Sequence, residues 1–162
     1  MAAVDYFLKI DGIEGESEDA KHGKEIEVLS WSFSEQQMGS HSHGTGGGAG
    51  KVSMQDFHFT MNVCKASPKL FLACATGEHI KSAILTCRKA GKEQQEFLKY
   101  TFSDLLISSY STGGSASGNV VPQDAISFNF TKIETAYKVQ KADGTLGDEF
   151  KAGYDLKKNV KV

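Results

Sequence analysis

The amino-acid sequence predicts an all-β fold with one α-helix, and a barrel in preference to an open sheet. Two long runs, residues 25–35 and 51–63, alternate apolar and polar side chains, which is the period of a strand with one buried face. In the first run the apolar side chains begin at even-numbered positions, as at Ile26, and continue at odd-numbered positions, as at Trp31. The second run shows the same kind of change. A strand that transfers its buried side chains to the other face contains a bulge or a sharp bend, as strands of small barrels do.

Strand-like alternation also marks most of the remaining chain. Further strands are expected at residues 4–10, 82–89, 95–102, 105–111 and 125–139, with a last strand through Tyr154, Leu156 and Val160. Turns are expected at residues 90–92, 112–118 and 142–144, each of which contains glycine. Residues 11–23 are acidic and contain glycine, so we expect a solvated loop there.

The expected helix covers residues 66–77. Ser67 is a good N-cap residue, Pro68 suits the first helical position, and Gly77 suits the C-terminal stop. Spacings of three and four residues give this helix one apolar side for docking on a sheet, made of Leu70, Phe71, Cys74 and Ala75.

Length and composition are those of one globular domain, residues 1–162, with a single substantial core. The net charge of -2 and the lack of a Lys/Arg cluster argue against a nucleic-acid-binding surface. No apolar run approaches the ~20 residues of a membrane helix, and the first residues have neither the basic nor the apolar region of a signal peptide. Cys64, Cys74 and Cys87 are odd in number and show no paired spacing, so we expect reduced thiols.

Motifs for catalysis or cofactor binding are weak. Residues 44–49 superficially match a dinucleotide fingerprint, but a strand follows them where the motif needs a helix N-terminus. His41 and His43 could hold zinc only if further ligands came from elsewhere, and a polar loop is the simpler interpretation. We therefore predict no catalytic residues, no cofactor and no metal, with a metal-dependent enzyme that uses the two histidines as a minor alternative.

A row of small hydroxyls marks one face of the first long run. Ser30, Ser32 and Ser34 alternate with Trp31 and Phe33, which suggests a smooth, polar and wetted surface opposite bulky aromatics. From spacing alone, an ordinary solvent face remains the simpler interpretation. Long strands with exposed edges also favour symmetric association, which pairs or covers those edges.

Eight segments along the chain carry a family resemblance: VDYFLKIDGIEGES, EIEVLSWSFS, GKVSMQDFHFT, ASPKLFLACATGEHIKSAILTCRKAG, SSYSTGGS, ISFNFTKIE, YKVQKADGTLG and GYDLKKNV. On these segments the chain resembles the Hcp family, the haemolysin-coregulated proteins of bacterial type VI secretion systems. The resemblance covers nearly the whole length, and the order and spacing of the segments make it specific.

The resemblance implies a bent antiparallel β-barrel of two packed sheets with one flanking helix and an extended glycine-rich loop. It implies a non-enzymatic structural subunit, which forms hexameric rings that stack into the inner tube of the secretion machine and are expelled from the cell. The implied partners are the chain itself, the contractile sheath, the spike and baseplate components, and small secreted effectors, with no nucleic acid and no stable membrane insertion. The protein would be made in the bacterial cytoplasm and leave through the type VI apparatus without a cleavable signal peptide.

The alternative function is a ring-shaped chaperone or carrier that binds small effectors in its lumen. Carried over by position, Ser32 matches a small residue that lines the lumen, Ser115 lies in another matching segment, and Ser30 and Ser34 share the face of Ser32. The extended loop implied to contact a neighbouring subunit or ring comprises Gly39, Ser40, His41, Ser42, His43, Gly44, Thr45, Gly46, Gly47, Gly48, Ala49 and Gly50.

Overall fold

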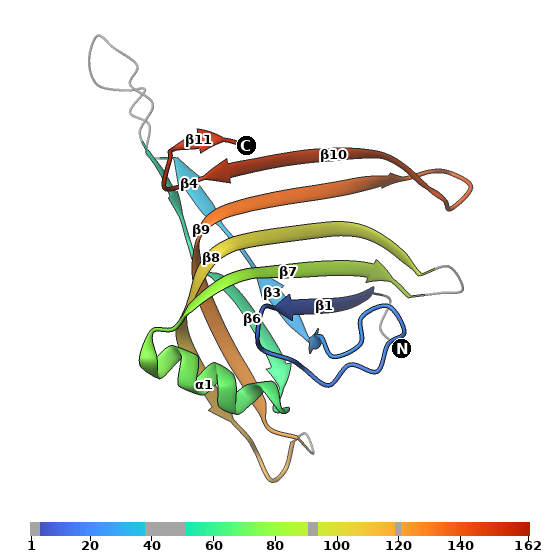
Figure 1. Ribbon diagram of the computed structural model, residues 1–162. Helices are drawn as coiled ribbons and strands as arrows, with labels where there is room; N and C mark the ends of the chain where they lie inside the picture. The colour runs from blue at the N-terminus through green and yellow to red at the C-terminus, as the bar shows by residue number, and fades with distance from the viewer. Residues whose placement is uncertain (1–3, 38–50, 91–93, 119–120) are drawn as a thin grey trace.

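Strands dominate the structure, a computed structural model that describes residues 4–37, 51–90, 94–118 and 121–162 (Figure 1). The elements in chain order are β1 (Val4–Ile10), β2 (Ile26–Val28), β3 (Ser30–Ser32), β4 (Glu35–Gln37), β5 (Val52–Met54), β6 (Phe57–Asn62), α1 (Ala66–Thr76), β7 (His79–Lys89), β8 (Gln95–Gly113), β9 (Gln123–Gln140), β10 (Leu146–Asp155) and β11 (Val160–Lys161). All strand pairs are antiparallel.

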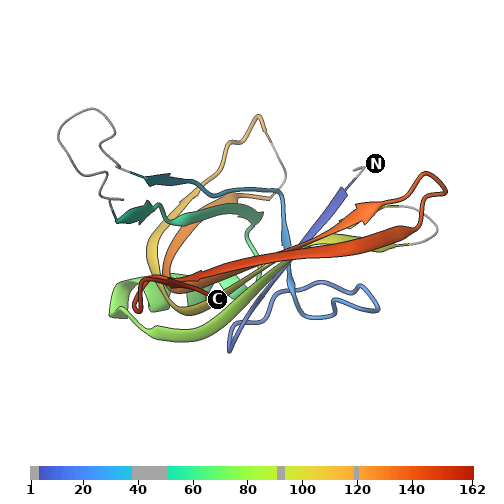
Figure 2. The same cartoon turned by 90° about the horizontal axis from the view of Figure 1, so that it is seen from above.

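The two longest strands, β8 and β9, belong to both halves of a bent sheet. The main order is β11-β10-β9-β8-β7-β1-β2, with β6 paired to both β9 and β3, while β4 and β5 form a separate hairpin. Residues 123–128 of β9 pair with β6, whereas residues 132–140 pair with β10. One pair of strands therefore connects an inner half, built on β3 and β6, to a projecting arm that ends in β10 (Figures 1 and 2).

A backbone kink produces the bend in β8. Asp104 has a left-handed backbone, with φ of 50°, and the register to β9 shifts between Ile107 and Ser109. The sequence predicted two strands here, residues 95–102 and 105–111. The structure has one strand of 19 residues with its kink in the predicted gap, because the hydrogen-bond ladder to β9 resumes after the kink.

The change of buried face in the first long run is confirmed for two of its three later apolar residues. Ile26 and Val28 are buried in β2 beside β1, and Trp31 and Phe33, of the opposite parity, pack partly buried against the core after the run pairs with β6 through β3. Leu29 was expected on the same face as Trp31 but is 47% exposed. The Leu29 N–H donates to the Thr60 oxygen over 2.9 Å, so the chain itself connects the outer strands to the inner half at this point. The bent sheet thus curls back on itself around one core (Figure 2).

Aromatic rings fill that core. Phe57 lies 4.9 Å from Phe102 and 5.0 Å from Phe128, measured between ring centroids, and all three side chains are fully buried. These residues come from β6, β8 and β9, so the cluster joins the inner half to the arm. Rings packed at such distances in tilted geometry stabilise beyond their buried area.

The helix ends where the sequence predicts but begins differently. Gly77 closes it in the left-handed conformation, with φ of 67°. The N-cap residue is Lys65, and Ser67 instead accepts a hydrogen bond from the Cys64 N–H and donates one to buried Asp124 in β9. Ser67 therefore fastens the first helical turn to the sheet, a long-range role that local capping preferences do not reveal.

The predicted apolar side of the helix was partly wrong. Leu70 is buried as expected, but it is accompanied by Ala66 and Ala73, whereas Phe71 is 59% exposed and Ala75 is also exposed. Small side chains let the helix approach β8 closely, and this rotates the larger Phe71 towards solvent, where its ring meets the edge of the Tyr110 ring.

Candidate functional site

Two rows of small or polar side chains cross β3, β6, β9 and β8 on one face of the inner half. Residues that face each other across antiparallel strands share a face of the sheet, so the register defines the rows. One row is Ser32, His58, Ser127 and Ser109, and the other is Ser30, Thr60, Ala125 and Ser111. We call this surface the hydroxyl face.

A shallow groove of about 290 Å³ runs along the hydroxyl face. Side chains of the hydroxyl face satisfy one another: the Ser30 and Thr60 hydroxyls lie 2.6 Å apart, and those of Ser109 and Ser127 lie 2.5 Å apart. The surface is consequently polar while its two rows contain no Lys, Arg, Asp or Glu. Such a surface can hold water or a polar partner without a strong attachment point.

The structure brings together some of the serines predicted from the sequence. Ser30 and Ser32 line the groove. Ser34 is exposed but lies outside the groove, and its backbone oxygen accepts a hydrogen bond from the Gln55 N–H. Ser115 lies in the turn after β8, where its hydroxyl is 3.1 Å from that of Ser117, and it does not line the groove.

Several groove residues were missed from the sequence. His58 and Thr60 alternate with the buried side chains of β6, and this pattern could have revealed them. The groove residues on β8 and β9 could not be found in this way, because only the strand register places them on the same face as Ser32: Ser109, Ser111 and Ala125.

The predicted contact loop, residues 39–50, lies outside the described residues, as do His41 and His43. It connects β4 to β5, whose last described pair is Gln37 with Val52. Within the described residues, no group of three or more His, Cys, Asp or Glu side chains could hold a metal ion.

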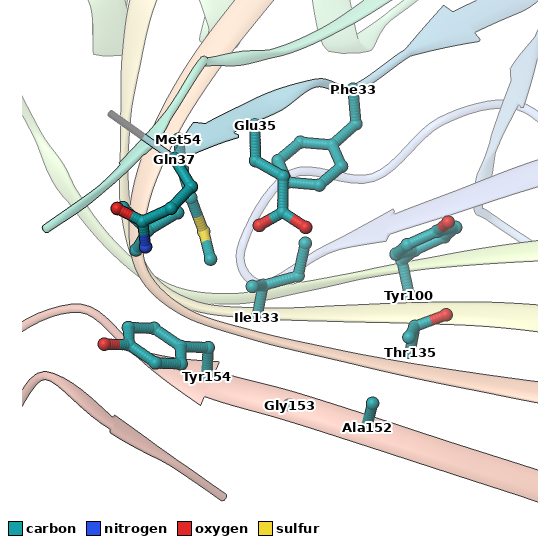
Figure 3. Close-up of a pocket in the computed structure, with 11 residues that line it drawn as sticks. Phe33, Glu35, Gln37, Met54, Tyr100, Ile133, Thr135, Ala152, Gly153 and Tyr154 are labelled. Atoms are coloured by element: carbon teal, nitrogen blue, oxygen red, sulfur yellow. The ribbon is translucent and has the colours of Figure 1, made fainter. Parts of the chain in front are cut away.

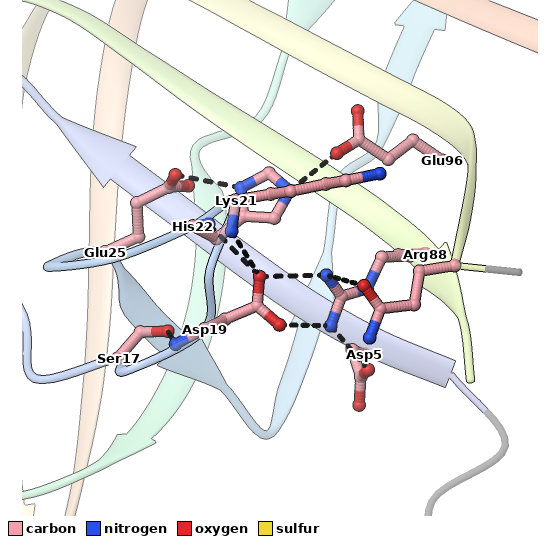
Figure 4. A network of polar contacts seen from close by, with 9 residues as sticks. Asp5, Ser17, Asp19, Lys21, His22, Glu25, Arg88 and Glu96 are labelled. Atoms are coloured by element: carbon pink, nitrogen blue, oxygen red, sulfur yellow. Dashed lines mark hydrogen bonds and ion pairs between the residues drawn. The ribbon is translucent and has the colours of Figure 1, made fainter. Parts of the chain in front are cut away.

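A second polar cluster fastens residues 11–25 to the sheet (Figure 4). The guanidinium of Arg88, in β7, is 3% exposed and forms a two-pronged pair with Asp19: Nη1 to Oδ1 over 3.0 Å and Nη2 to Oδ2 over 2.8 Å. Nη2 also donates to Asp5 Oδ2 over 3.2 Å. The hydrogen bonds from Arg88 hold the pKa of Asp19 well below its usual range, and the Asp19 carboxylate raises the pKa of Arg88.

His22 completes this cluster beside Arg88. Its ring nitrogens lie 2.8 Å from Glu25 and 2.6 Å from Glu96, and the ring stacks on Phe7 at 4.5 Å. The prediction of a solvated loop at residues 11–23 is therefore only partly right: the segment is a loop and most of its residues are exposed, but His22 is only 7% exposed and Ser17 6%. One of the acidic residues that suggested solvent exposure, Asp19, is the partner of a cation from a distant strand.

The sequence profile of the family described as "Type VI secretion system effector, Hcp" matches residues 7–137 of the chain. Protein hcp1 of Pseudomonas aeruginosa is 45% identical over 162 residues, which cover 99% of each protein. The chain belongs to the Hcp family. Among solved structures, Hcp1 from Salmonella typhimurium is 40% identical with a TM-score of 0.83, over 99% of this chain and 100% of that one. Another, of a type six secretion system protein, is 30% identical with a TM-score of 0.93, over 99% of this chain and 100% of the other.

This Hcp chain is accordingly a type VI secretion tube protein, and hexameric rings are the assembly known for its family. The family is one of structural and secreted proteins and is not an enzyme family. The predicted fold class is confirmed as mainly β, with a bent, packed antiparallel sheet and one helix. Across the described ranges, no helix is both long and apolar enough to cross a membrane.

Proposed function

We propose that the hydroxyl face forms part of the lumen wall of the ring, and that small effectors lie against it during secretion. The observation that carries this proposal is the alignment of eight small or polar positions in two rows across four strands. In a ring, each subunit would add its rows to a polar wall without exposed aromatic side chains. A polar wall of this kind would stay hydrated, and water could bridge it to the surface of a folded cargo.

Replacing Ser32 with glutamine tests the lumen role. The longer side chain would fill the groove from β3, so secreted levels of small effectors should fall while the ring still forms. The matched control is Ser34→Gln, because Ser34 is also exposed on the same run but lies outside the groove. Quantitative mass spectrometry of culture supernatants measures the effectors, and light scattering measures the ring. Unchanged effector levels for Ser32→Gln, or an equal loss for Ser34→Gln, would refute the lumen assignment.

We also propose that residues 39–50 contact a neighbouring subunit or the next ring, and that Ser115 faces the lumen. The support for the loop contact is the resemblance to the family's extended loop, and the two strands that flank residues 39–50 in the chain, β4 and β5, form a sheet of their own. Deleting residues 44–48 should shorten or abolish tubes in electron micrographs while single rings persist. Tubes of normal length from the deleted protein would count against the contact.

The remaining partners follow from the tube role. We propose that a contractile sheath surrounds the stacked rings, that spike and baseplate components adjoin their ends, and that the chain is made in the cytoplasm and exported without a cleavable signal. Immunoblots of cytoplasmic and culture fractions test the export route: the chain should have the same mass in both. A shorter secreted form would contradict it.

A further inference from the structure

The apolar face of the sheet continues beyond the core onto the projecting arm. The strand register aligns one row of side chains from β2 to β10: Val28, Tyr6, Cys87, Leu98, Tyr137 and Phe150. Along this row the exposed fraction rises from 1% at Cys87 to 45% at Tyr137 and 61% at Phe150. Val139, which shares the face of Tyr137, is 39% exposed. The row therefore begins inside the core and ends exposed to solvent.

The next row leads into a cleft. Its members are Ile26, Leu8, Leu85, Tyr100, Thr135 and Ala152. The last three line a cleft of about 420 Å³ between the arm and the β4–β5 hairpin, together with Phe33 and Met54 (Figure 3). The uncovered end of the first row and this cleft form one surface, which we call the arm face: Leu98, Tyr100, Tyr137, Val139 and Phe150 with the cleft.

The other side of the arm differs in chemistry. Lys138 pairs in register with Glu149, and Lys151 forms an ion pair with Glu149 over 3.7 Å while its side chain stays 71% exposed. A sheet with one charged side is suited to water there, whereas its apolar side requires a cover. On the described residues, the chain's own core covers only the near end of that apolar side.

We propose that the arm face is a contact between neighbouring subunits of the ring, covered by the adjacent copy of this chain. The proposal rests on the ring assembly of the family and names the surface that closes it. In a cyclic ring, each subunit offers one patch to the copy ahead and a different patch to the copy behind. The arm projects beyond the inner half, so its apolar side is placed to reach over a neighbour (Figures 1 and 2).

A second copy fits this surface better than a transient partner does. The apolar row is continuous with the core, so a neighbour seated on it would extend that core, which is the character of permanent homo-oligomer interfaces. An apolar face repeated on every subunit of a secreted tube would promote aggregation if it were left open. Coverage by the next copy removes all of these faces at once when the ring closes.

Two substitutions on adjacent residues of β10 test the proposal. Phe150→Glu places a charge on the arm face, and Lys151→Glu places the same side chain on the opposite face. We expect Phe150→Glu to weaken the affinity between subunits about tenfold or more, which is typical of losing one buried aromatic side chain at an interface. The particle mass measured by light scattering at micromolar protein concentration should therefore fall from that of a ring to that of single chains. Lys151→Glu should keep the ring. A ring mass for Phe150→Glu equal to the wild type at every dilution would overturn the proposal.

Oxidative footprinting of the wild type provides a measurement that does not depend on a variant folding correctly. In the ring, Phe150 and Tyr137 should be oxidised several-fold more slowly than in chains dissociated by dilution. Equal oxidation rates in the two states would overturn the arm face as a contact. If the wild type itself forms no ring, the proposed assembly fails; if it forms a ring in which Phe150 remains fully reactive, only this contact fails.

Discussion

Replacing Asp19 with alanine should weaken the fold by removing the main partner of a buried guanidinium. Both carboxylate oxygens of Asp19 accept hydrogen bonds from Arg88, over 3.0 and 2.8 Å, and Arg88 is 3% exposed. Removing one member of a buried ion pair typically costs 3–5 kcal/mol, because the other charge stays in the interior without compensation.

The structure places the expected loss at the lower end of that range, about 3 kcal/mol. Asp5 would still lie 3.2 Å from Nη2 of Arg88 as a second partner, and the Asp19 side chain is 17% exposed, so the pair is not completely buried. The matched control is Asp5→Ala, which removes a single hydrogen bond from a side chain that is 37% exposed. That change should cost less than about 1 kcal/mol, as exposed ion pairs do.

Urea denaturation followed by the fluorescence of Trp31 measures both changes, since this is the single tryptophan of the chain. Trp31 packs at 5.5 Å from Tyr100 and 6.0 Å from Phe57, between ring centroids, so its emission reports on the core. All variants need the same protein concentration, because subunit association contributes to apparent stability. If Asp19→Ala lost no more than Asp5→Ala, the two-pronged pair would not be what anchors residues 11–25.

Three further outcomes are expected. The guanidinium of Arg88 holds the pKa of Asp19 below its unfolded value of about 3.9, so the stabilisation of the fold by the ion pair is complete above about pH 3.9 and is lost as the pH falls. In denaturation series from pH 6 to pH 2, the wild type should therefore lose more stability than Asp19→Asn. Parallel losses in the two proteins would contradict this. Gly15→Ala would place a Cβ 2.4 Å from the Glu25 backbone oxygen and should cost more than about 2 kcal/mol in thermal unfolding, whereas Gly113→Ala, with open space around it, should be nearly neutral. Burial raises the pKa of the Cys87 thiol to about 12, so this thiol should react with a maleimide at pH 8 only after unfolding, whereas Cys64 and Cys74 are partly exposed. Peptide mapping locates the label, and rapid labelling of Cys87 in the native protein would refute the prediction.

Much of the fold follows from local patterns in the sequence. The change of parity between Ile26 and Trp31 predicted a bend, and the structure has one at Leu29. Gly77 predicted the end of the helix because a left-handed residue is needed there. These features depend on a few neighbouring residues, and backbone geometry and side-chain periodicity are enough to predict them.

The candidate surfaces depended on tertiary structure. Periodicity places Ser32 on a face, but the backbone hydrogen bonds that pair strands carry little sequence information. Periodicity therefore does not reveal that His58 and Ser109 share a row with Ser32. The same limit hid the arm face, because only the strand register shows that the row through Phe150 leaves the core.

Composition alone suggested solvent for residues 11–23, whose cationic partner, Arg88, lies 69 residues beyond Asp19. The sequence by itself determined which residues alternate, where the strands bend, where the helix stops and to which family the chain is similar. Only the tertiary structure decided which distant residues meet, because such contacts depend on strand register and on the curl of the sheet, and neither is a property of a local stretch of chain.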